Sequence, residues 1–398
     1  MDGYVLMDGR RKVATILTLA PFIFTFAFAL DIYVPSIPSI HIYFSTTEGM
    51  VQWTISLFLL LTGVGQLVVG PISDRVGRKI IIVAGTLCFL VGCILAAFAP
   101  TIMTLIVARM IQGLGACSMM VATFAMVRDL YSGDDVAQVY SFLNSGIALS
   151  PLIAPIIGGY LAKWYGWRSG FIFLAILAVL ITLLALIKVK ESLVQENRVT
   201  LSKAIFSNYQ LIAKNTTFLM YAFAASVGFA CFLTFFSVSS YILISILRVP
   251  EQHFGFYFAA IGVVFFAGSL LSGYASKKFG TYLTVLMGTI LTTLGGIVML
   301  VWYLTLGLSI GAFMGPMMIM GVGGALLMGG GAGGAIEPFP EMAGMASAVF
   351  GFCEFVFAFV ISTIVLAWKV TNTVPLSLTL ICLGFAALVA CLLKFKKK

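Results

Sequence analysis

Long stretches without any charge are the feature of this sequence that most constrains its fold. A helix that spans a bilayer needs about 20 predominantly apolar residues, and stretches of that length recur along the whole chain. The 398 residues are 61% hydrophobic and only 9% charged, whereas soluble domains carry about 25% charged residues. The pattern predicts an all-α integral membrane protein and excludes a β-barrel, whose strands alternate polar and apolar residues.

The apolar stretches predict twelve transmembrane helices. The interval from Phe279 to Ile336 has no charge, and we divide it near Tyr303 to Leu308. Arg10 to Lys12 precede the first span and no small-residue cleavage site follows, which indicates a retained helix rather than a signal peptide. The predicted spans are 13–35, 50–72, 80–98, 102–127, 136–162, 169–187, 217–245, 254–275, 282–303, 309–333, 343–368 and 372–393.

Basic residues gather on alternate connections between these spans. With the N-terminus inside, only Lys163, Arg168, Arg248 and Lys369 fall on outer connections. Because lysine and arginine are retained on the cytoplasmic side, the sequence predicts a membrane protein with both termini in the cytoplasm. The net charge of +9 then reflects topology and no nucleic-acid surface, although the C-terminal lysines can touch anionic lipid headgroups. The inner connections hold Arg10, Arg11, Lys12, Arg75, Arg78, Lys79, Arg128, Lys188, Lys190, Arg198, Lys203, Lys214, Lys277, Lys278, Lys394, Lys396, Lys397 and Lys398.

An internal repeat divides the chain into halves. The loop 70–77 and the loop 273–280 match at a register of 203 residues, with glycine at both ends of each loop. We therefore expect an N-terminal six-helix bundle at 1–187, a cytoplasmic linker at 188–216 that can form an amphipathic helix, and a C-terminal six-helix bundle at 217–398. Two pseudo-symmetric bundles around a central cavity are a known transporter architecture. One chain supplies both halves, so a monomer suffices.

Three charges interrupt the predicted spans. A charge at bilayer depth costs roughly 2.5–3.5 kcal/mol on insertion scales, so such residues usually face a polar cavity and a partner. Asp31 and Arg109 each lie 19 residues from a cytoplasmic helix end, about 28 Å along a helix, and can meet across a cavity. The hypothesis is that Asp31 carries a proton and Arg109 tunes it; the alternative is a static pair that holds two helices together. Glu354 can bind a cationic substrate, carry a second proton, or sit neutral in a polar pocket.

A second candidate site is the loop after the second span, which reads Gly70-Pro-Ile-Ser-Asp-Arg-Val-Gly-Arg-Lys79. We expect Gly70 and Pro71 to end one helix and Gly77 to allow a tight return. Arg78 can then reach Asp129 at the end of the fourth span, in a salt bridge that locks the inner face closed in one state. The alternative is a basic loop that only anchors the topology. The residues of this predicted lock are Gly70, Asp74, Arg75, Gly77, Arg78 and Asp129.

Other spans carry weaker signals. Pro151 and Pro155 predict a kinked fifth helix, and glycines 146, 158 and 159 allow close packing against a neighbour; an ordinary kinked membrane helix is the alternative. The many aromatic residues of the seventh span are expected to include lipid-facing ones. Buried amides and hydroxyls need partners, so the candidates for a substrate cavity, besides Glu354, are Tyr33, Gln52, Gln66, Gln112 and Asn144.

No pattern in the sequence indicates enzymatic chemistry. The seven cysteines all fall in apolar spans without ligand spacing, so we expect buried packing residues and no metal. Neither a Walker loop nor a dinucleotide, metalloprotease or nucleophile-elbow motif occurs. The sequence thus predicts a protein that is not an enzyme and needs no cofactor.

Several motifs resemble a known family. The loop GPISDRVGRK resembles the signature loop of the major facilitator superfamily, and Arg109-Met-Ile-Gln112-Gly-Leu-Gly115 resembles the fourth-helix arginine motif of its proton-coupled drug exporters. Residues 146–159 are similar to the fifth-helix antiporter motif, except that Ser150 replaces the usual glycine before Pro151. Residues 30–38 and 337–347 resemble the bicyclomycin and chloramphenicol resistance branch.

The resemblance covers essentially the whole chain and implies twelve helices, proton antiport and outward movement of a lipophilic small molecule. Glu354 is not part of that branch pattern. An exporter of an endogenous metabolite, such as a siderophore or amino acid, is the nearest alternative on the same fold. A membrane sensor that retains a transporter scaffold is an alternative of a different class.

Overall fold

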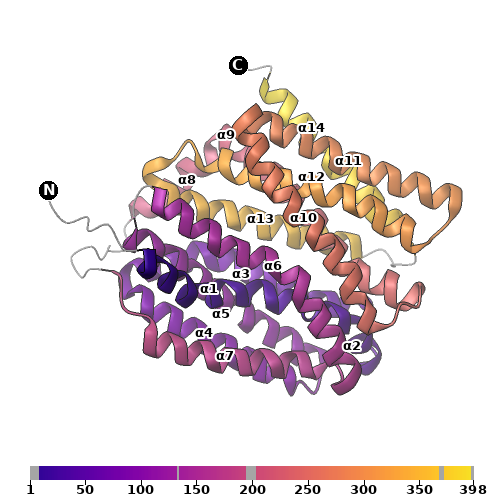
Figure 1. Ribbon diagram of the computed structural model, residues 1–398, viewed down its shortest axis with the longest axis horizontal. Coiled ribbons are helices and arrows are strands. Elements are labelled where there is room, and N and C mark those ends of the chain that lie inside the picture. Colours follow the sequence, from indigo (N-terminus) through magenta and orange to yellow (C-terminus); the bar gives the residue numbers. More distant parts are fainter. Residues whose placement is uncertain (1–8, 132–133, 194–202, 367–371, 396–398) are drawn as a thin grey trace.

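A computed structural model describes residues 9–131, 134–193, 203–366 and 372–395. Within these ranges the chain is helical and contains no strand. Figure 1 shows long helices side by side, with the first half of the chain in one bundle and the second half in another. Two ends of the molecule serve as landmarks below: the end marked by α8 and the opposite end, marked by α2.

The N-terminal bundle contains six long helices. They are α1 (Gly9–Asp31), α3 (Glu48–Val76), α4 (Arg78–Ala97), α5 (Ile102–Leu130), α6 (Asp134–Tyr165) and α7 (Arg168–Lys188). The first predicted span is interrupted, because α1 ends at Asp31 and is followed by a 3-10 turn, η1 (Val34–Ser36), and a short helix, α2 (Ile37–Tyr43). Pro35 and Pro38 each begin one of these elements, as expected for residues without a backbone N–H.

The C-terminal bundle repeats this arrangement after α8 (Lys203–Lys214), the helix in the predicted linker. The division between the ninth and tenth spans falls where the sequence predicts it, with α11 ending at Leu306 and α12 beginning at Ile310. The seventh span finishes as a π-helical turn, η3 (Tyr241–Ile246), and a 3-10 turn, η4 (Pro340–Met342), precedes α13. The long helices are α9 (Thr216–Ser240), α10 (Glu251–Phe279), α11 (Thr281–Leu306), α12 (Ile310–Ile336), α13 (Ala343–Leu366) and α14 (Val374–Phe395).

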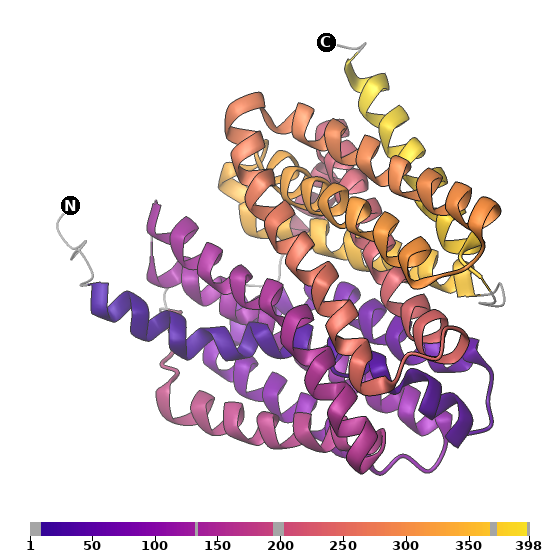
Figure 2. The same ribbon diagram turned by 45° about the vertical axis from the view of Figure 1, so that its right-hand side comes forward.

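The packing partners show the two-fold pseudo-symmetry. In the first bundle α4 packs on α5 and α7, α3 on α5, and α1 on α5 and α6; in the second, α11 packs on α12 and α14, α10 on α12, and α9 on α12 and α13. Each pair in one bundle has its counterpart six spans later. Between the bundles the main contacts are α3 with α13 and α6 with α10, a pair of contacts that the same symmetry interchanges (Figure 2).

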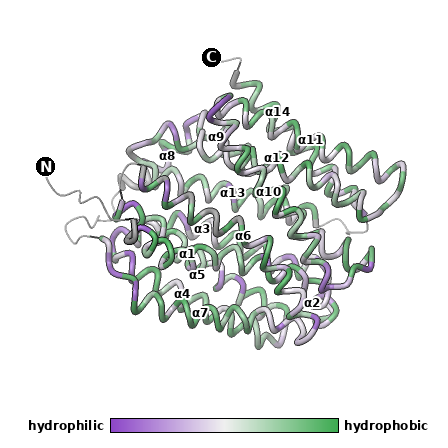
Figure 3. The backbone as a smooth tube through the Cα atoms, viewed as in Figure 1, coloured by the Kyte–Doolittle hydropathy of each residue, from purple (hydrophilic) through white to green (hydrophobic). Residues whose placement is uncertain are grey.

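The surface of the helices identifies the molecule as a multi-pass membrane protein. Eleven stretches of the described residues are long and apolar enough to cross a bilayer, and α6, with 32 residues, occupies the remaining place in the order. Figure 3 shows hydrophobic residues along the lengths of the helices and hydrophilic ones concentrated toward their ends. Large apolar side chains such as Leu17, Ile176 and Leu270 are more than half exposed, as suits helices that face lipid.

Two local expectations from the sequence are wrong. Gly70 and Pro71 do not end a helix, because α3 continues to Val76 with Pro71 inside it. Proline at 71 removes the N–H that would bond to the carbonyl of Leu67, and the Tyr209 hydroxyl of α8 donates to that carbonyl instead, at 3.3 Å. The chain reverses at Gly77, whose φ of +119° requires glycine.

The aromatic helix of the second bundle is also placed differently from the expectation. Helix α9 is enclosed rather than lipid-facing, and most of its aromatic side chains are buried, including Phe218, Phe232, Phe235 and Phe236. Aromatic rings from α10 and α12 stack on it, as where Phe235 lies 5.6 Å from Phe258 between ring centroids. An apolar helix is compatible with lipid and with a protein interior alike, so composition alone does not distinguish the two.

Candidate functional site

Asp31 lies at the last residue of α1 and is only 2% exposed. Its Oδ2 atom accepts a hydrogen bond of 2.6 Å from the hydroxyl of Ser150 on α6. Within the described part of the chain, Ser150 is the one side chain that contacts the carboxylate, and no cation forms an ion pair with it. The site therefore holds a buried carboxyl group against a neutral donor.

Arg109 lies on α5 and is completely buried. Its Nη1 atom donates to the backbone oxygen of Ala29 at 3.2 Å and to Oε1 of Gln112 at 2.9 Å, and its Nε atom donates to the backbone oxygen of Thr54 at 3.4 Å. The guanidinium also stacks 4.4 Å from the ring centroid of Phe58, an arrangement that attracts a cation to the aromatic face. Arg109 is thus held by neutral groups, and its Nη2 atom has no partner in the described residues.

The expected meeting of Asp31 and Arg109 does not occur in this structure. The carboxylate faces α6, whereas the guanidinium contacts the backbone of α1 at Ala29, two residues earlier, and the backbone of α3. The two charges share a neighbourhood without an ion pair between them among the described residues. Neither the hypothesis of direct tuning nor the alternative of a static pair describes this conformation.

Two of the candidates for a substrate cavity surround Arg109. The ring of Tyr33 lies 4.9 Å from its guanidinium carbon and the Tyr33 hydroxyl bonds to Thr54 at 2.8 Å. Gln112 accepts from Arg109 and donates to the sulfur of Cys93 at 3.0 Å. These groups satisfy one another in the present conformation. The side chain of the further candidate Asn144 lies outside the described residues, as does the environment of Gly146.

Gln52 belongs to a polar seam between the bundles. Its Nε2 atom donates to the hydroxyl of Ser237 on α9 at 2.7 Å, and one turn later Ser56 lies 3.4 Å from the hydroxyl of Ser362 on α13. The seam continues to the α2 end, where the Ser39 hydroxyl donates to Oε1 of Glu251 on α10 at 2.6 Å. The bundles are therefore joined by direct hydrogen bonds from the first three turns of α3 to the α2 end.

Helix α6 packs unusually closely on both bundles. A Cβ atom at Gly158 would lie 2.2 Å from the backbone oxygen of Ile32, and one at Gly159 would lie 2.5 Å from the backbone oxygen of Glu251. Only glycine permits such an approach of two backbones. The predicted close packing of Gly158 and Gly159 against neighbouring backbone is therefore present. The helix itself runs without interruption through Pro151 and Pro155.

Glu354 lies on α13, next to the seam. Its neighbour Phe355 contacts the ring of Phe26 on α1, 5.4 Å away between centroids, and that of Phe229 on α9, 5.2 Å away. Glu354 itself is partly exposed, and no ion pair or hydrogen bond to its carboxylate occurs in the described residues. An acid that directly precedes an aromatic cluster at the junction of both bundles can interact with a cationic or hydrogen-bonding ligand.

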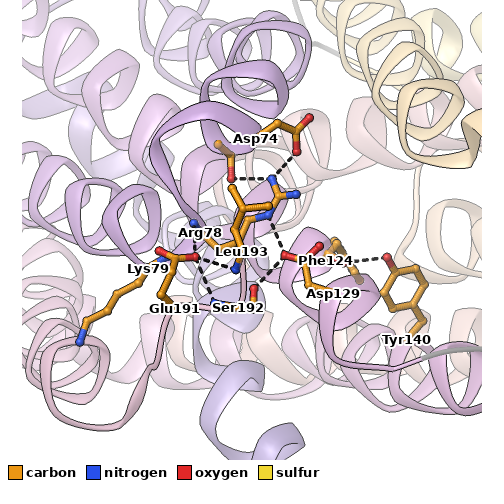
Figure 4. A network of polar contacts seen from close by, with 10 residues as sticks. Asp74, Arg78, Lys79, Phe124, Asp129, Tyr140, Glu191, Ser192 and Leu193 are labelled. Atoms are coloured by element: carbon orange, nitrogen blue, oxygen red, sulfur yellow. Dashed lines mark hydrogen bonds and ion pairs between the residues drawn. The ribbon is translucent and has the colours of Figure 1, made fainter. Parts of the chain in front are cut away.

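The loop between α3 and α4 forms a separate network at the α8 end (Figure 4). Arg78 contacts Asp74 at 2.5 Å and Asp129 at 2.9 Å, so the expected Arg78–Asp129 bridge is present. Asp74 lies in the last turn of α3. Arg75 is exposed, and no hydrogen bond or ion pair joins it to any described residue.

Residues after α7 complete this network and were not found from the sequence. The carboxylate of Glu191 accepts from the backbone N–H groups of Arg78 and Lys79, at 2.9 and 3.2 Å, which suits an anion at the start of α4. Ser192 donates to Asp129 at 2.8 Å. No motif spacing links residue 191 to residue 78. The only sequence signal for Glu191 is that it directly follows Lys188 and Lys190 at the end of α7.

The partners of Arg78 among the described residues lie on the first bundle and on the segment directly after α7, so its network does not join the two halves directly. At this end the bundles approach through the neighbouring Arg128, whose guanidinium atoms would lie 3.0–3.1 Å from a Cβ at Gly344 of α13. The described residues contain no group of three or more His, Cys, Asp or Glu side chains placed to hold a metal ion.

Comparisons with known proteins agree with this arrangement. The family model described as "Major Facilitator Superfamily" matches residues 19–363. The chain is 30% identical to a chloramphenicol resistance protein of Pseudomonas aeruginosa, covering 85% of this chain and 80% of the relative. It is 28% identical to a bicyclomycin resistance protein homolog of Haemophilus influenzae, covering 89% of each, and 28% identical to multidrug resistance protein D of Escherichia coli, covering 87% and 86%.

Solved structures support the fold alone. A POT family peptide transporter in complex with sulfate superposes with a TM-score of 0.76 at 15% identity, covering 95% of this chain and 93% of that one. Another POT family transporter, in complex with a thioalcohol-conjugated peptide, gives a TM-score of 0.73 at 14% identity, covering 97% and 95%.

Proposed function

This chain belongs to the Major Facilitator Superfamily, and we propose that it is a proton-coupled antiporter that exports lipophilic small molecules, drugs among them, across the bacterial inner membrane. The names of its relatives support the drug class of the cargo. The α8 end, with both termini, faces the cytoplasm in this proposal, because the basic connections gather there. A single chain is the working unit.

The observation that carries the proposal is the state of Asp31. A carboxyl group that is 2% exposed and has no cation beside it is costly to keep ionised, so a proton is a natural occupant. Arg109, held nearby by neutral groups, supplies a positive field without neutralising the acid. Exchange then requires that the seam at the α2 end opens, that substrate leaves to the outside while Asp31 gains a proton, and that the seam then closes again.

Glu354 is proposed to contact the substrate. It is a partly exposed acid next to Phe355, whose ring contacts Phe26 on α1 and Phe229 on α9. An acid beside an aromatic cluster suits a molecule with an apolar body and a positive or polar group. Its position on α13, which packs on α3 of the other bundle, exposes it to both halves as they move. The loop network around Arg78 is proposed to stiffen the inner end of the first bundle, so that this bundle moves as one body.

Transport into everted membrane vesicles tests these roles. With an imposed pH gradient, acid inside, vesicles that contain the wild type should accumulate labelled chloramphenicol. Asp31→Asn should reduce this gradient-driven uptake to the level of vesicles without the protein, because the side chain no longer binds a proton. Glu354→Gln should retain proton coupling and weaken the apparent affinity. Glu337→Gln, which changes an exposed acid after α12, is the matched control.

Three outcomes would each contradict a different part of this proposal. Gradient-driven uptake that persists in Asp31→Asn rules out this residue as the proton carrier. If the wild type accumulates neither chloramphenicol nor bicyclomycin, yet exchanges an amino acid or siderophore for protons, the cargo is an endogenous metabolite. If no solute in either class produces a proton flux, the antiport mechanism is wrong.

A further inference from the structure

We propose that Ser150 is a positioning residue for the proton site: its hydroxyl stabilises the ionised form of Asp31 and connects that carboxylate to the contact between the two bundles. This inference rests on the proposed role of Asp31 as proton carrier. It concerns a residue that departs from the antiporter motif, where glycine is usual before the proline. Glycine has no hydroxyl, so the motif itself does not supply this bond.

The geometry fits a charge-assisted hydrogen bond. The Oγ of Ser150 lies 2.6 Å from Oδ2 of Asp31, within the range of 2.5–2.7 Å typical of a hydroxyl that donates to a carboxylate. Ser150 is completely buried and Asp31 is 2% exposed, so water does not compete for either group. Most buried hydroxyls here bond within their own helix, as Ser226 does to the oxygen of Ala222. Ser150 instead reaches across from α6 to α1.

Other charged groups near the carboxylate are engaged elsewhere. Arg109 on α5 bonds to Ala29 and Gln112. Arg168 at the start of α7 bonds to Tyr43 and to a backbone oxygen, and Glu251 on α10 bonds to Ser39. Helix α9, which contacts η1, carries no charged side chain, and the charged residues of α6 lie only near its ends. Tyr33, the titratable group two residues away, bonds to Thr54.

The same segment of α6 touches the opposite bundle. Pro151 and Leu152 directly follow Ser150, and their side-chain atoms would lie 3.3 and 2.8 Å from a Cβ at Gly262 of α10. When a proton neutralises Asp31, the bond from Ser150 loses its charge assistance and weakens. The segment that loses this restraint is the one that packs against α10. Proton binding is thereby linked to the seam that must open.

Infrared titration of the purified protein in lipid nanodiscs tests this link without any substrate. The carboxylic acid band of Asp31 is isolated as the pH-dependent absorption that Asp31→Asn removes. Because a hydrogen bond to the charged form favours that form, Ser150→Ala should keep the proton to higher pH, moving the midpoint up by about one to two pH units. Ser150→Gly, which adds no bulk, should do the same, and Ser226→Ala, a matched loss of a buried hydroxyl, should leave the midpoint within about 0.3 units.

The outcomes separate the inference from the function on which it rests. If Asp31 titrates and its midpoint is the same in the wild type, Ser150→Ala and Ser150→Gly, the role of Ser150 is overturned and the proton carrier stands. If Asp31→Asn removes no pH-dependent band, the carrier itself is wrong. An equal shift in Ser226→Ala also overturns the inference, because the effect is then a general loosening of the bundle.

Discussion

The close approach of α1 and α6 yields a quantitative prediction for Gly158. A methyl group at this position would lie 2.2 Å from the backbone oxygen of Ile32, whereas ordinary contact begins near 3.4 Å, so Gly158→Ala must separate the helices by about 1.2 Å. Overpacking of this kind costs roughly 1–3 kcal/mol. The Ser150–Asp31 bond of 2.6 Å lies one residue from Ile32, and the same displacement would stretch it beyond hydrogen-bonding distance.

Gly170 on α7 provides the matched control, because a Cβ there would lie 4.0 Å from the same oxygen of Ile32. Both changes replace a helical glycine by alanine and share the gain in helix propensity of up to about 1 kcal/mol. Gly158→Ala should lower the free energy of unfolding by about 2 kcal/mol relative to Gly170→Ala, and it should reduce proton-driven uptake at least tenfold.

Thermal unfolding is readily followed with a thiol-reactive dye. Four of the seven cysteines, Cys93, Cys117, Cys231 and Cys391, are buried and become reactive only when the bundles open. The expectation that every cysteine is buried is wrong, because Cys382 is exposed and Cys88 and Cys353 are half-buried, so their reaction before unfolding is the baseline of the assay. Gly158→Ala should react at a temperature a few degrees below Gly170→Ala. If the two variants unfold at the same temperature and transport equally well, the backbone contact at Ile32 does not constrain the protein and the reasoning from it is refuted.

Two further predictions concern the α8 end. Arg78→Gln should lower the free energy of unfolding by about 1–2 kcal/mol, mostly through its half-buried contact with Asp129, whereas Arg75→Gln, the same charge change on an exposed side chain, should cost no more than about 0.5 kcal/mol. Equal losses in dye-monitored unfolding would contradict the network. Tyr209→Phe should cost about 1 kcal/mol because it leaves the Leu67 carbonyl without a donor, and Pro71→Ala, which restores the backbone donor, should abolish that cost in a double-mutant cycle. Additive effects would show that the hydroxyl acts elsewhere.

The arrangement of spans was largely predictable because it depends on properties that are local in sequence. Uncharged stretches of bilayer length predicted the long helices. This held even in the charge-free interval, where α11 ends at Leu306 and α12 begins at Ile310. Arg78 and Asp129 could be paired because each ends or begins a helix on the same side. Such features need no knowledge of which helices are neighbours.

What could not be predicted depends on contacts between distant segments. Pro71 lies inside its helix, and Tyr209, 142 residues away from Leu67, supplies the missing donor to the Leu67 carbonyl. Ser150 and Asp31 are 119 residues apart, and nothing in either local sequence indicates that one faces the other. The sequence placed Asp31 and Arg109 at similar depth, but depth along a helix does not determine the side of the helix on which a residue lies. It therefore could not show that the carboxylate faces α6 while the guanidinium contacts α1 and α3.

The enclosed position of α9 has a consequence for the order in which the protein is made. This helix is synthesised before α10, α12, α13 and α14, the helices that surround it. Until those helices have been inserted, α9 is in contact with lipid. Three of its buried hydroxyl groups are satisfied within the helix during that interval, because Ser226, Thr234 and Ser237 each donate to a carbonyl one turn earlier in the same helix. A newly made helix that already satisfies its own polar groups can enter the bilayer alone. The neighbouring helices can then pack around it.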